Sequence, residues 1–219
     1  MKIPISRGPE GAREATGHVV IIDVIRAFTT AAYAFSAGIE EIELVATVKD
    51  ALSRPGFRMG EVDGRLIPGF DHNNSPSRMI GQRLSGRAVQ RTTSGTQGVV
   101  LATQAESLWL GSLVVASATA RALQDKDEVT LVAMNALPEG TEDEDLAAAL
   151  YLQALLNGEP PPTERVISMV RNSNSAASFV PDDPDRPMED MDCCTAIEAF
   201  DFAMMVHRQD GRLIARPWR

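Results

Sequence analysis

The feature that most constrains the fold is a short run of β-branched residues near the start of the chain. Residues 18–23 read HVVIID, and the four residues from Val19 to Ile22 are all apolar and β-branched. Such a run is typical of a strand that is buried on both faces, as in a parallel sheet covered by helices. The run ends at Asp23. We therefore expect a carboxylate at the carboxyl end of a buried strand.

Helical and strand-like patterns alternate after this first strand. Residues 26–38 read as a helix that stops at Gly38, and residues 41–47 read as a second strand. Thr47 can cap the helix that follows. This alternation predicts an α/β fold with three α/β/α layers and a mostly parallel or mixed sheet. We expect one α/β domain over residues 1–219, in which residues 164–219 form a C-terminal appendage.

Turn and cap signals place further elements. Asp63-Gly64 is typical of a hairpin turn and predicts a β-ribbon at a sheet edge, and Asp210-Gly211 predicts a second hairpin. Ser75 and Pro76 have the order of an N-cap and a first helical residue. Thr141 and Glu144 have capping-box spacing before a long Ala- and Leu-rich helix that ends before Gly158.

Charge and composition limit the classes of binding partner that this chain can have. The formal net charge is −9, and an acidic chain is poorly suited to general nucleic-acid binding. The longest uncharged run, residues 107–120, is shorter than the roughly 20 apolar residues of a membrane helix. The two cysteines, Cys193 and Cys194, are adjacent and suit a reducing cytoplasm. We expect a cytoplasmic homo-oligomer that binds neither nucleic acid nor membranes.

Asp23 is followed by residues that suit anion binding. Arg26 comes just after it, and Thr29 and Thr30 stand in the first turn of the expected helix. A helix N-terminus presents free backbone N–H groups to an anion, and an arginine adds positive charge. From the residues alone, Asp23 either takes part in chemistry or only caps this helix.

A similar arrangement follows a later strand. Residues 91–96 read RTTSGT, so that hydroxyls, backbone N–H groups and Gly95 follow Arg91. Gly95 allows close backbone approach, and the segment can hold an oxyanion. The alternative is an ordinary polar turn between strand and helix.

Carboxylates form the third component. Glu61 and Asp71 bracket the ribbon, and Glu144 and Asp145 stand in the first turn of the long helix. Mg²⁺ binds through one or two carboxylates together with water and substrate. The alternative for Glu144 and Asp145 is a favourable interaction with the helix dipole.

Several catalytic classes are excluded because their motifs are missing. The sequence contains no GxxxxGK[ST], no GxGxxG and no GxSxG. The haloacid-dehalogenase phosphatases carry a second Asp two residues after the first, and Ile25 stands there. Neither cysteine is followed by an arginine six residues later, as a cysteine phosphatase requires.

Together these motifs resemble the 2-phosphosulfolactate phosphatase family. The segments DVIRAFTTAAYAFSAG, GEVDGRLIPGFDHNNSPS, RTTSGT, GSLVVASATA and EDLAAALYLQALL occur in the family's order and span about residues 18 to 156. The resemblance implies a Mg²⁺-dependent phosphatase of the coenzyme M pathway on a family-specific α/β/α fold. The implied substrate is 2-phosphosulfolactate, a small anionic phosphate ester.

The family's site residues carry over where the motifs match. The resemblance implies catalytic roles for Asp23, Arg26 and Arg91. It implies substrate binding by Thr29, Thr30, Asn74, Ser75, Thr92, Thr93, Gly95, Thr96 and Ser112. It implies metal binding by Asp23, Glu61, Asp71, Glu144 and Asp145. Asp23 could be a metal ligand, a general base or a nucleophile.

The chain departs from the family pattern at a few positions. Phe28 stands where the family usually has Thr, and the pair 72–73 (His-Asn) replaces an apolar residue and a glycine. Ser94 and Val115 each replace an Asn, and both replacements remove amide donors. Two alternatives therefore accompany the main hypothesis: a phosphatase for a different small phosphate ester, and a non-enzymatic anion-binding oligomeric protein.

Overall fold

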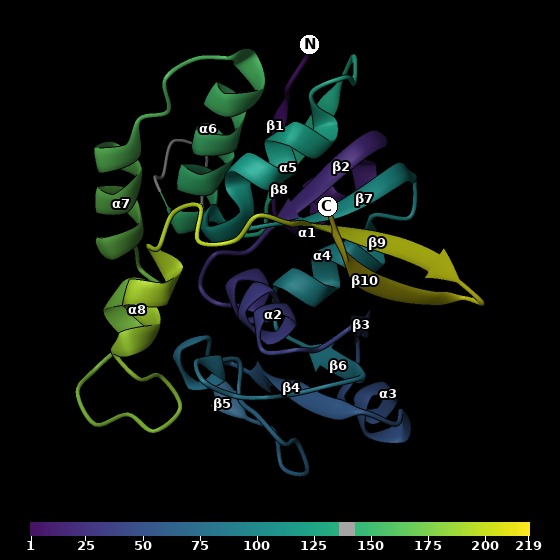
Figure 1. The fold of residues 1–219 in the computed structure, drawn as a ribbon, viewed down its shortest axis with the longest axis vertical. Coiled ribbons are helices and arrows are strands. Elements are labelled where there is room, and N and C mark those ends of the chain that lie inside the picture. Colours follow the sequence, from purple (N-terminus) through teal and green to yellow (C-terminus); the bar gives the residue numbers. More distant parts are fainter. Residues whose placement is uncertain (136–142) are drawn as a thin grey trace.

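The computed structural model describes residues 1–135 and 143–219, in which ten strands form one sheet (Figure 1). The strands are β1 (Ile5–Arg7), β2 (Gly17–Ile22), β3 (Glu41–Leu44), β4 (Phe57–Val62), β5 (Arg65–Leu66), β6 (Arg87–Arg91), β7 (Ala105–Gly111), β8 (Val129–Ala133), β9 (Ala203–Gln209) and β10 (Arg212–Trp218). Their order across the sheet is β1-β8-β2-β7-β9-β10-β3-β6-β4-β5.

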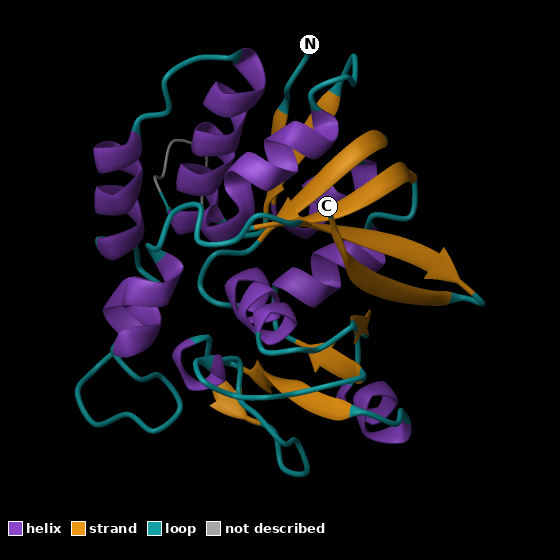
Figure 2. Ribbon diagram, viewed as in Figure 1, coloured by secondary structure: helices purple, strands orange, loops and turns teal. Residues whose placement is uncertain are grey.

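Helices cover both faces of this sheet (Figure 2). The α-helices are α1 (Gly8–Glu14), α2 (Ala27–Ser36), α3 (Val48–Ser53), α4 (Gly95–Leu101), α5 (Ala116–Leu123), α6 (Glu144–Asn157), α7 (Thr163–Arg171) and α8 (Glu189–Cys194). Three short 3₁₀ helices are η1 (Ser77–Met79), η2 (Leu113–Val115) and η3 (Ala176–Ser178).

β2 is buried on both faces, as its β-branched run predicts. Val19 and Ile21 pack into one core cluster, with apolar residues of α1, α2 and α4. Val20 and Ile22 pack into a second cluster, with residues of α5, α6 and α7. Because successive side chains of a strand point to opposite faces, these two clusters are the two interfaces of a three-layer α/β/α fold. The predicted fold class is confirmed.

The sheet has two parallel parts joined by an antiparallel hairpin. β1, β8, β2 and β7 are mutually parallel neighbours, and so are β3, β6 and β4. Between them β9 pairs antiparallel with β7, and β10 pairs antiparallel with β3. The segment 164–219, expected as an appendage, thus contains two central strands of the sheet.

Several local predictions are confirmed. The Thr47 side chain accepts a hydrogen bond from the backbone N–H of Asp50 and caps α3. Asp63 and Gly64 turn β4 into β5 at the sheet edge, and Asp210 and Gly211 turn β9 into β10. Gly158 ends α6 in the left-handed conformation, at φ 71°.

Other local predictions differ from the structure. Only the three-residue helix η1 forms after Ser75, and Ser75 does not cap it, because its hydroxyl donates to Asp190 instead. Asp143 caps α6 by accepting from the backbone N–H groups of Asp145 and Leu146. Thr141, of the predicted capping box, lies outside the described residues. Among the helices of residues 1–135 and 143–219, none is long and apolar enough for a membrane crossing.

Candidate functional site

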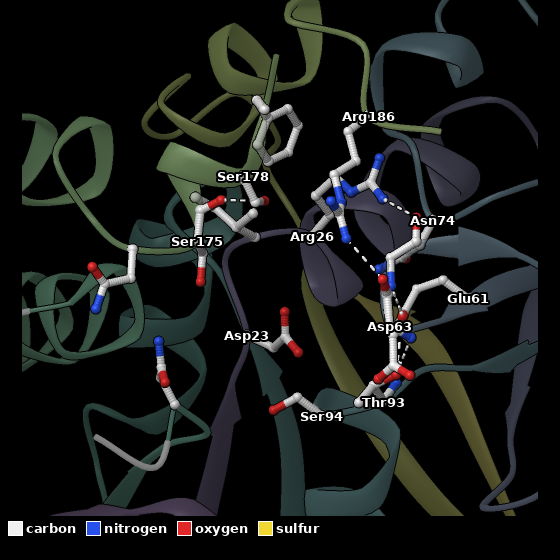
Figure 3. A pocket seen from close by; sticks show the side chains of 15 residues that line it. Asp23, Arg26, Glu61, Asp63, Asn74, Thr93, Ser94, Ser175, Ser178 and Arg186 are labelled. Carbon is white, nitrogen blue, oxygen red and sulfur yellow. Dashed lines mark hydrogen bonds between the residues drawn. The ribbon is translucent and has the colours of Figure 1, made fainter. Parts of the chain in front are cut away.

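A polar cavity of about 380 Å³ opens beside the carboxyl end of β2 (Figure 3). The β4–β5 turn, the start of α4 and the segment 174–186 form its other walls. Its charged lining residues are Asp23, Arg26, Glu61, Asp63 and Arg186. Asn74, Thr93, Ser94, Asn135, Asn174, Ser175 and Ser178 add polar side chains. The volume suits a small molecule.

A second cavity, of about 360 Å³, adjoins the first. Asp23, Thr93, Ser94, Asn135 and Ser175 line both cavities. Glu144 and Asp145 line only the second. Asp23 is thus the one carboxylate that belongs to both cavities among the residues that the structure describes.

Asp23 is a buried carboxylate that is fixed by backbone groups. Its Oδ1 accepts from the N–H of Ala27 at 2.9 Å, at the start of α2. Burial, together with the smaller effects of the Glu61 and Glu144 charges, raises the pKa of Asp23 to about 7, although the hydrogen bond from Ala27 acts in the opposite direction. Asp23 therefore both caps α2 and presents a perturbed carboxyl group to the cavity.

Glu61 connects the β4–β5 turn to the start of α4. Its Oε1 accepts from the backbone N–H of Thr93 at 2.6 Å, and its Oε2 accepts from the N–H of Gly64 and the hydroxyl of Thr93, at 2.6 and 3.0 Å. These bonds hold one wall of the cavity together. They also place Thr93 at the cavity, as its matched motif predicts.

Glu144 and Asp145 face the second cavity from the first turn of α6. Asp145 accepts from the backbone N–H groups of Val24, at 2.7 Å, and Asn135, at 3.0 Å. Burial, followed by the charges of Asp23 and Glu144, raises the pKa of Asp145 well above its usual value. The Oε2 atom of Glu144 is buried and has no hydrogen-bond partner among the described residues. Three carboxylates, those of Asp23, Glu144 and Asp145, thus lie at the second cavity.

Arg26 lines the cavity, but its charge is compensated. Its Nη1 atom donates to Asp190 Oδ2 at 2.7 Å and to the carbonyl oxygen of Asp185 at 2.8 Å. Both side chains of the Arg26–Asp190 pair are buried, with 4% and 0% exposed. The guanidinium also lies over the Phe179 ring, 5.5 Å from its centroid. Arg26 is thus fixed from the C-terminal part of the chain.

The part of the cavity that comes from residues 174–186 was not predicted from the sequence. Ser175, Ser178 and Phe179 line it, and so does Arg186. In Figure 3, Arg26 and Arg186 enter from one end, Ser94 lies at the other, and Asp23 lies between them. These residues belong to a polar, proline-rich region outside the matched motifs, so only the charge of Arg186 could have indicated a role.

The structure leaves several of the predicted site residues outside both cavities. Arg91 donates to the carbonyl oxygens of Glu61 and Ala46. Asp71 is exposed and accepts from the backbone N–H of Arg58. Neither side chain lines the cavities.

Most of the remaining predicted residues do not line the two cavities either. The hydroxyls of Thr29 and Ser112 form a hydrogen bond of 2.6 Å, and Thr30 Oγ1 is buried without a hydrogen-bond partner in residues 1–135 and 143–219. Thr92 and Thr96 bond each other's backbone and hydroxyl groups at the start of α4. Asn74 lines the first cavity, whereas Ser75 is fully buried beside it.

Gly95 lies against Asp23 at the start of α4. A Cβ atom there would be 2.8 Å from Asp23 Oδ2 and 2.8 Å from Ala27 Cβ. The close approach therefore needs a glycine.

The fold and the cavity together define a class of protein. It is an α/β/α protein with a small site that combines carboxylates, hydroxyls and guanidinium groups, and this chemistry suits a small anionic ligand with a cation.

Comparison with known proteins identifies the family within this class. Residues 6–208 match the family model described as 2-phosphosulpholactate phosphatase. The chain is 33% identical to the probable 2-phosphosulfolactate phosphatase of Bacillus subtilis, over 97% of this chain and 96% of that protein. It is 37% identical to the probable 2-phosphosulfolactate phosphatase of Carboxydothermus hydrogenoformans, over 71% and 68%. A 2-phosphosulfolactate phosphatase of Methanocaldococcus jannaschii is 31% identical over 52% of each chain. The chain belongs to the 2-phosphosulfolactate phosphatase family, a family of phosphoric monoester hydrolases.

The departures from the family pattern lie mostly away from the cavities. Phe28 and Val115 are fully buried in the core with α2 and α4. Asn73 donates to the side chain and carbonyl oxygen of Asp185, so it holds the segment that carries Arg186. Of these replaced positions, Ser94 is the one that lines the cavities.

Proposed function

We propose that this chain hydrolyses the phosphate monoester of 2-phosphosulfolactate to sulfolactate and phosphate, with Mg²⁺. The names of its relatives supply the substrate. The observation that carries the proposal is the position of Asp23, a buried carboxylate at the end of β2 that lines both adjoining cavities. Such a position lets one carboxylate meet the reacting phosphoryl group and a metal ion at the same time.

The donor set is compatible with Mg²⁺. In the described residues no three carboxylate, histidine or cysteine side chains come close enough together to hold a metal by themselves. Mg²⁺ does not require such a cage, since it usually keeps several waters and binds one or two carboxylates and the substrate's phosphate. Among the described residues Glu144 has a buried oxygen without a hydrogen-bond partner, and burial, followed by the charges of Glu61 and Glu144, raises the pKa of Asp23. Asp23 and Glu144 would hold the ion.

The chain's own groups position the substrate. Phosphoryl transfer depends mainly on alignment and on neutralising charge. When bound, Mg²⁺ would withdraw charge from the phosphoryl oxygens. Asp23 presents its carboxylate to the phosphoryl group, while Thr93 and Ser94 line the cavity beside it. Glu61 keeps Thr93 in place through two hydrogen bonds.

Phosphate release from 2-phosphosulfolactate tests this function. We expect turnover with Mg²⁺ that EDTA abolishes, and a kcat at least about 100-fold lower in Asp23→Asn, the usual scale for a catalytic acid–base group. Asp210→Asn is a matched control, because Asp210 lies at the β9–β10 turn with a φ of 51° that asparagine tolerates. Near-normal kcat in Asp23→Asn would remove Asp23 from the reaction, and turnover unaffected by EDTA would remove the metal.

A different small phosphate ester is the second candidate, because Ser94 replaces a family asparagine in the cavity lining. A panel of small esters separates the two candidates, since the proposal requires 2-phosphosulfolactate to have the highest kcat/KM. A homo-oligomeric state, a cytoplasmic location and a role in coenzyme M synthesis are further parts of the proposal. Light scattering and cell fractionation test the first two.

A further inference from the structure

The first cavity needs a cation other than Arg26. Asp23, Glu61 and Asp63 line it, against Arg26 and Arg186. The charge of Arg26 is already matched by Asp190, which is fully buried. Arg26 Nη1 lies 2.7 Å from Asp190 Oδ2. The charge of Arg26 is thus balanced within the fold. Arg186 is the other guanidinium of the described lining.

Arg186 has donors to spare. Its Nη2 atom donates to the carbonyl oxygen of Asp63 at 2.7 Å. Within residues 1–135 and 143–219 no carboxylate lies within ion-pairing distance of its guanidinium. A guanidinium has five N–H donors in a planar fork that matches the oxygens of a sulfonate or carboxylate.

The position of Arg186 is fixed by its surroundings. Residues 179–188, here called the strap, run past the β4–β5 hairpin. Asp185 accepts from the N–H of Leu66 at 3.1 Å and from Asn73 Nδ2 at 2.8 Å. Arg65 pairs with Asp183 at 3.0 Å. These contacts hold the part of the strap that directly precedes Arg186, so the backbone that carries the arginine is fixed against the hairpin.

The β4–β5 turn leaves room for this side chain. A Cβ atom on Gly64 would lie 2.3 Å from Arg186 Nη2 and 2.5 Å from its Nε. Any residue larger than glycine would push the guanidinium away from the turn. Gly64 is therefore needed for two reasons: its φ of 79° suits the turn, and its missing side chain leaves space for the Arg186 guanidinium.

We propose that Arg186 is a specificity-determining residue that binds the second acidic group of the substrate, a sulfonate or carboxylate, while the phosphate lies at Asp23. This inference deepens the proposed function and rests on it. The proposed substrate carries three acidic groups, and the Asp23 end of the cavity serves only the phosphate. Arg186 selects for esters that carry a further oxyanion.

Four phosphate esters test the proposal in the wild type and in Arg186→Gln. They are 2-phosphosulfolactate, 2-phospholactate without the sulfonate, the phosphate ester of 2-hydroxyethanesulfonate without the carboxylate, and 4-nitrophenyl phosphate with neither. We expect Arg186→Gln to lower kcat/KM for 2-phosphosulfolactate by about 10- to 100-fold, the scale of a hydrogen bond to a charged group. The value for 4-nitrophenyl phosphate should stay within about threefold. 2-Phospholactate and the phosphate ester of 2-hydroxyethanesulfonate each carry one further acidic group. The one whose kcat/KM falls more in Arg186→Gln identifies the group that Arg186 binds.

A matched variant separates charge from the position of the strap. Arg65→Gln removes a cation that holds the same strap and does not line the cavity. Arg186→Lys keeps a positive charge and should recover part of the loss for the acidic esters. The proposal is overturned if all four esters lose the same factor, if none does, or if Arg65→Gln reproduces the pattern of Arg186→Gln.

Failure of the proposed function has a different signature. If the wild type releases no phosphate from any of the esters, calorimetric titration with sulfolactate and with inorganic phosphate replaces the kinetic test. Sulfolactate binding at least about tenfold weaker in Arg186→Gln, with phosphate binding unchanged, supports Arg186 as the anion ligand although the phosphatase function fails. If the wild type and Arg186→Gln bind sulfolactate equally, the role of Arg186 is overturned together with the phosphatase function.

Discussion

Removing Asp190 should destabilise the fold strongly, because its carboxylate is the counter-charge of a buried arginine. Asp190 is completely buried and accepts four hydrogen bonds. These come from Arg26 Nη1 at 2.7 Å, Ser75 Oγ at 2.8 Å, and the N–H and hydroxyl of Ser77 at 2.9 and 2.6 Å. In Asp190→Ala all four donors lose this acceptor, and the Arg26 guanidinium, only 4% exposed, keeps a buried charge without its counter-charge.

The magnitude follows from the burial of the pair. Breaking a buried ion pair by removing one partner costs about 3–5 kcal/mol. For a chain of this length, 1 kcal/mol shifts the unfolding temperature by roughly 2–4 °C, so the melting temperature should fall by about 6–20 °C. Urea unfolding followed by circular dichroism measures the free energy directly.

A double variant checks the reasoning. Arg26→Met together with Asp190→Leu removes both charges, and we expect it to cost less than Asp190→Ala alone, because no uncompensated charge remains. Two results would refute the assignment of a buried, mutually dependent pair. One is a loss of unfolding free energy below about 1 kcal/mol in Asp190→Ala. The other is a loss in the double variant that equals the sum of the losses in Arg26→Met and Asp190→Leu.

Two other perturbations give distinct outcomes. In the metal-free protein the free energy of unfolding should fall as pH rises from about 4 to about 7, because the pKa of Asp23 is raised to about 7 in the fold and the unfolded chain releases this proton first. Asp23→Asn should flatten this slope in melting temperatures taken from pH 4 to 8, and an unchanged slope would contradict the raised pKa. Gly95→Ala should lower kcat about tenfold or more, because the added methyl group would lie 2.8 Å from Asp23 Oδ2 and displace it. Steady-state kinetics on protein with wild-type circular dichroism measures this, and an unchanged kcat would mean that Asp23 tolerates the displacement.

The parts of the fold that sequence could predict are those set by neighbouring residues. The run Val19 to Ile22 fixes a two-faced strand, because its alternation and its β-branched composition act locally. The Asp63-Gly64 turn and the Thr47 cap likewise depend on residues within a few positions. The placement of Asp23, Thr93 and Ser94 at one cavity follows from strand ends and was predictable for the same reason.

The remaining features depend on contacts between distant residues. Arg26 and Asp190 are 164 positions apart, and nothing local indicates that one acidic residue of the acidic helix α8 will be fully buried. Arg91 follows a strand as expected, yet its side chain donates to carbonyl oxygens behind the cavity. Charged, proline-rich segments such as residues 181–188 usually indicate solvated loops, so its charge was the only signal that Arg186 carried.

The central position of β9 and β10 has a consequence for biosynthesis. These strands join the β7 and β3 sides of the sheet, yet they follow all the other strands in the sequence. During translation the chain therefore carries two unpaired strand edges, each able to pair with another chain, until the hairpin has left the ribosome. Such late closure through long-range pairing is typical of slow folding. We expect nascent chains of this protein to rely on chaperones more than an α/β protein whose central strands come first.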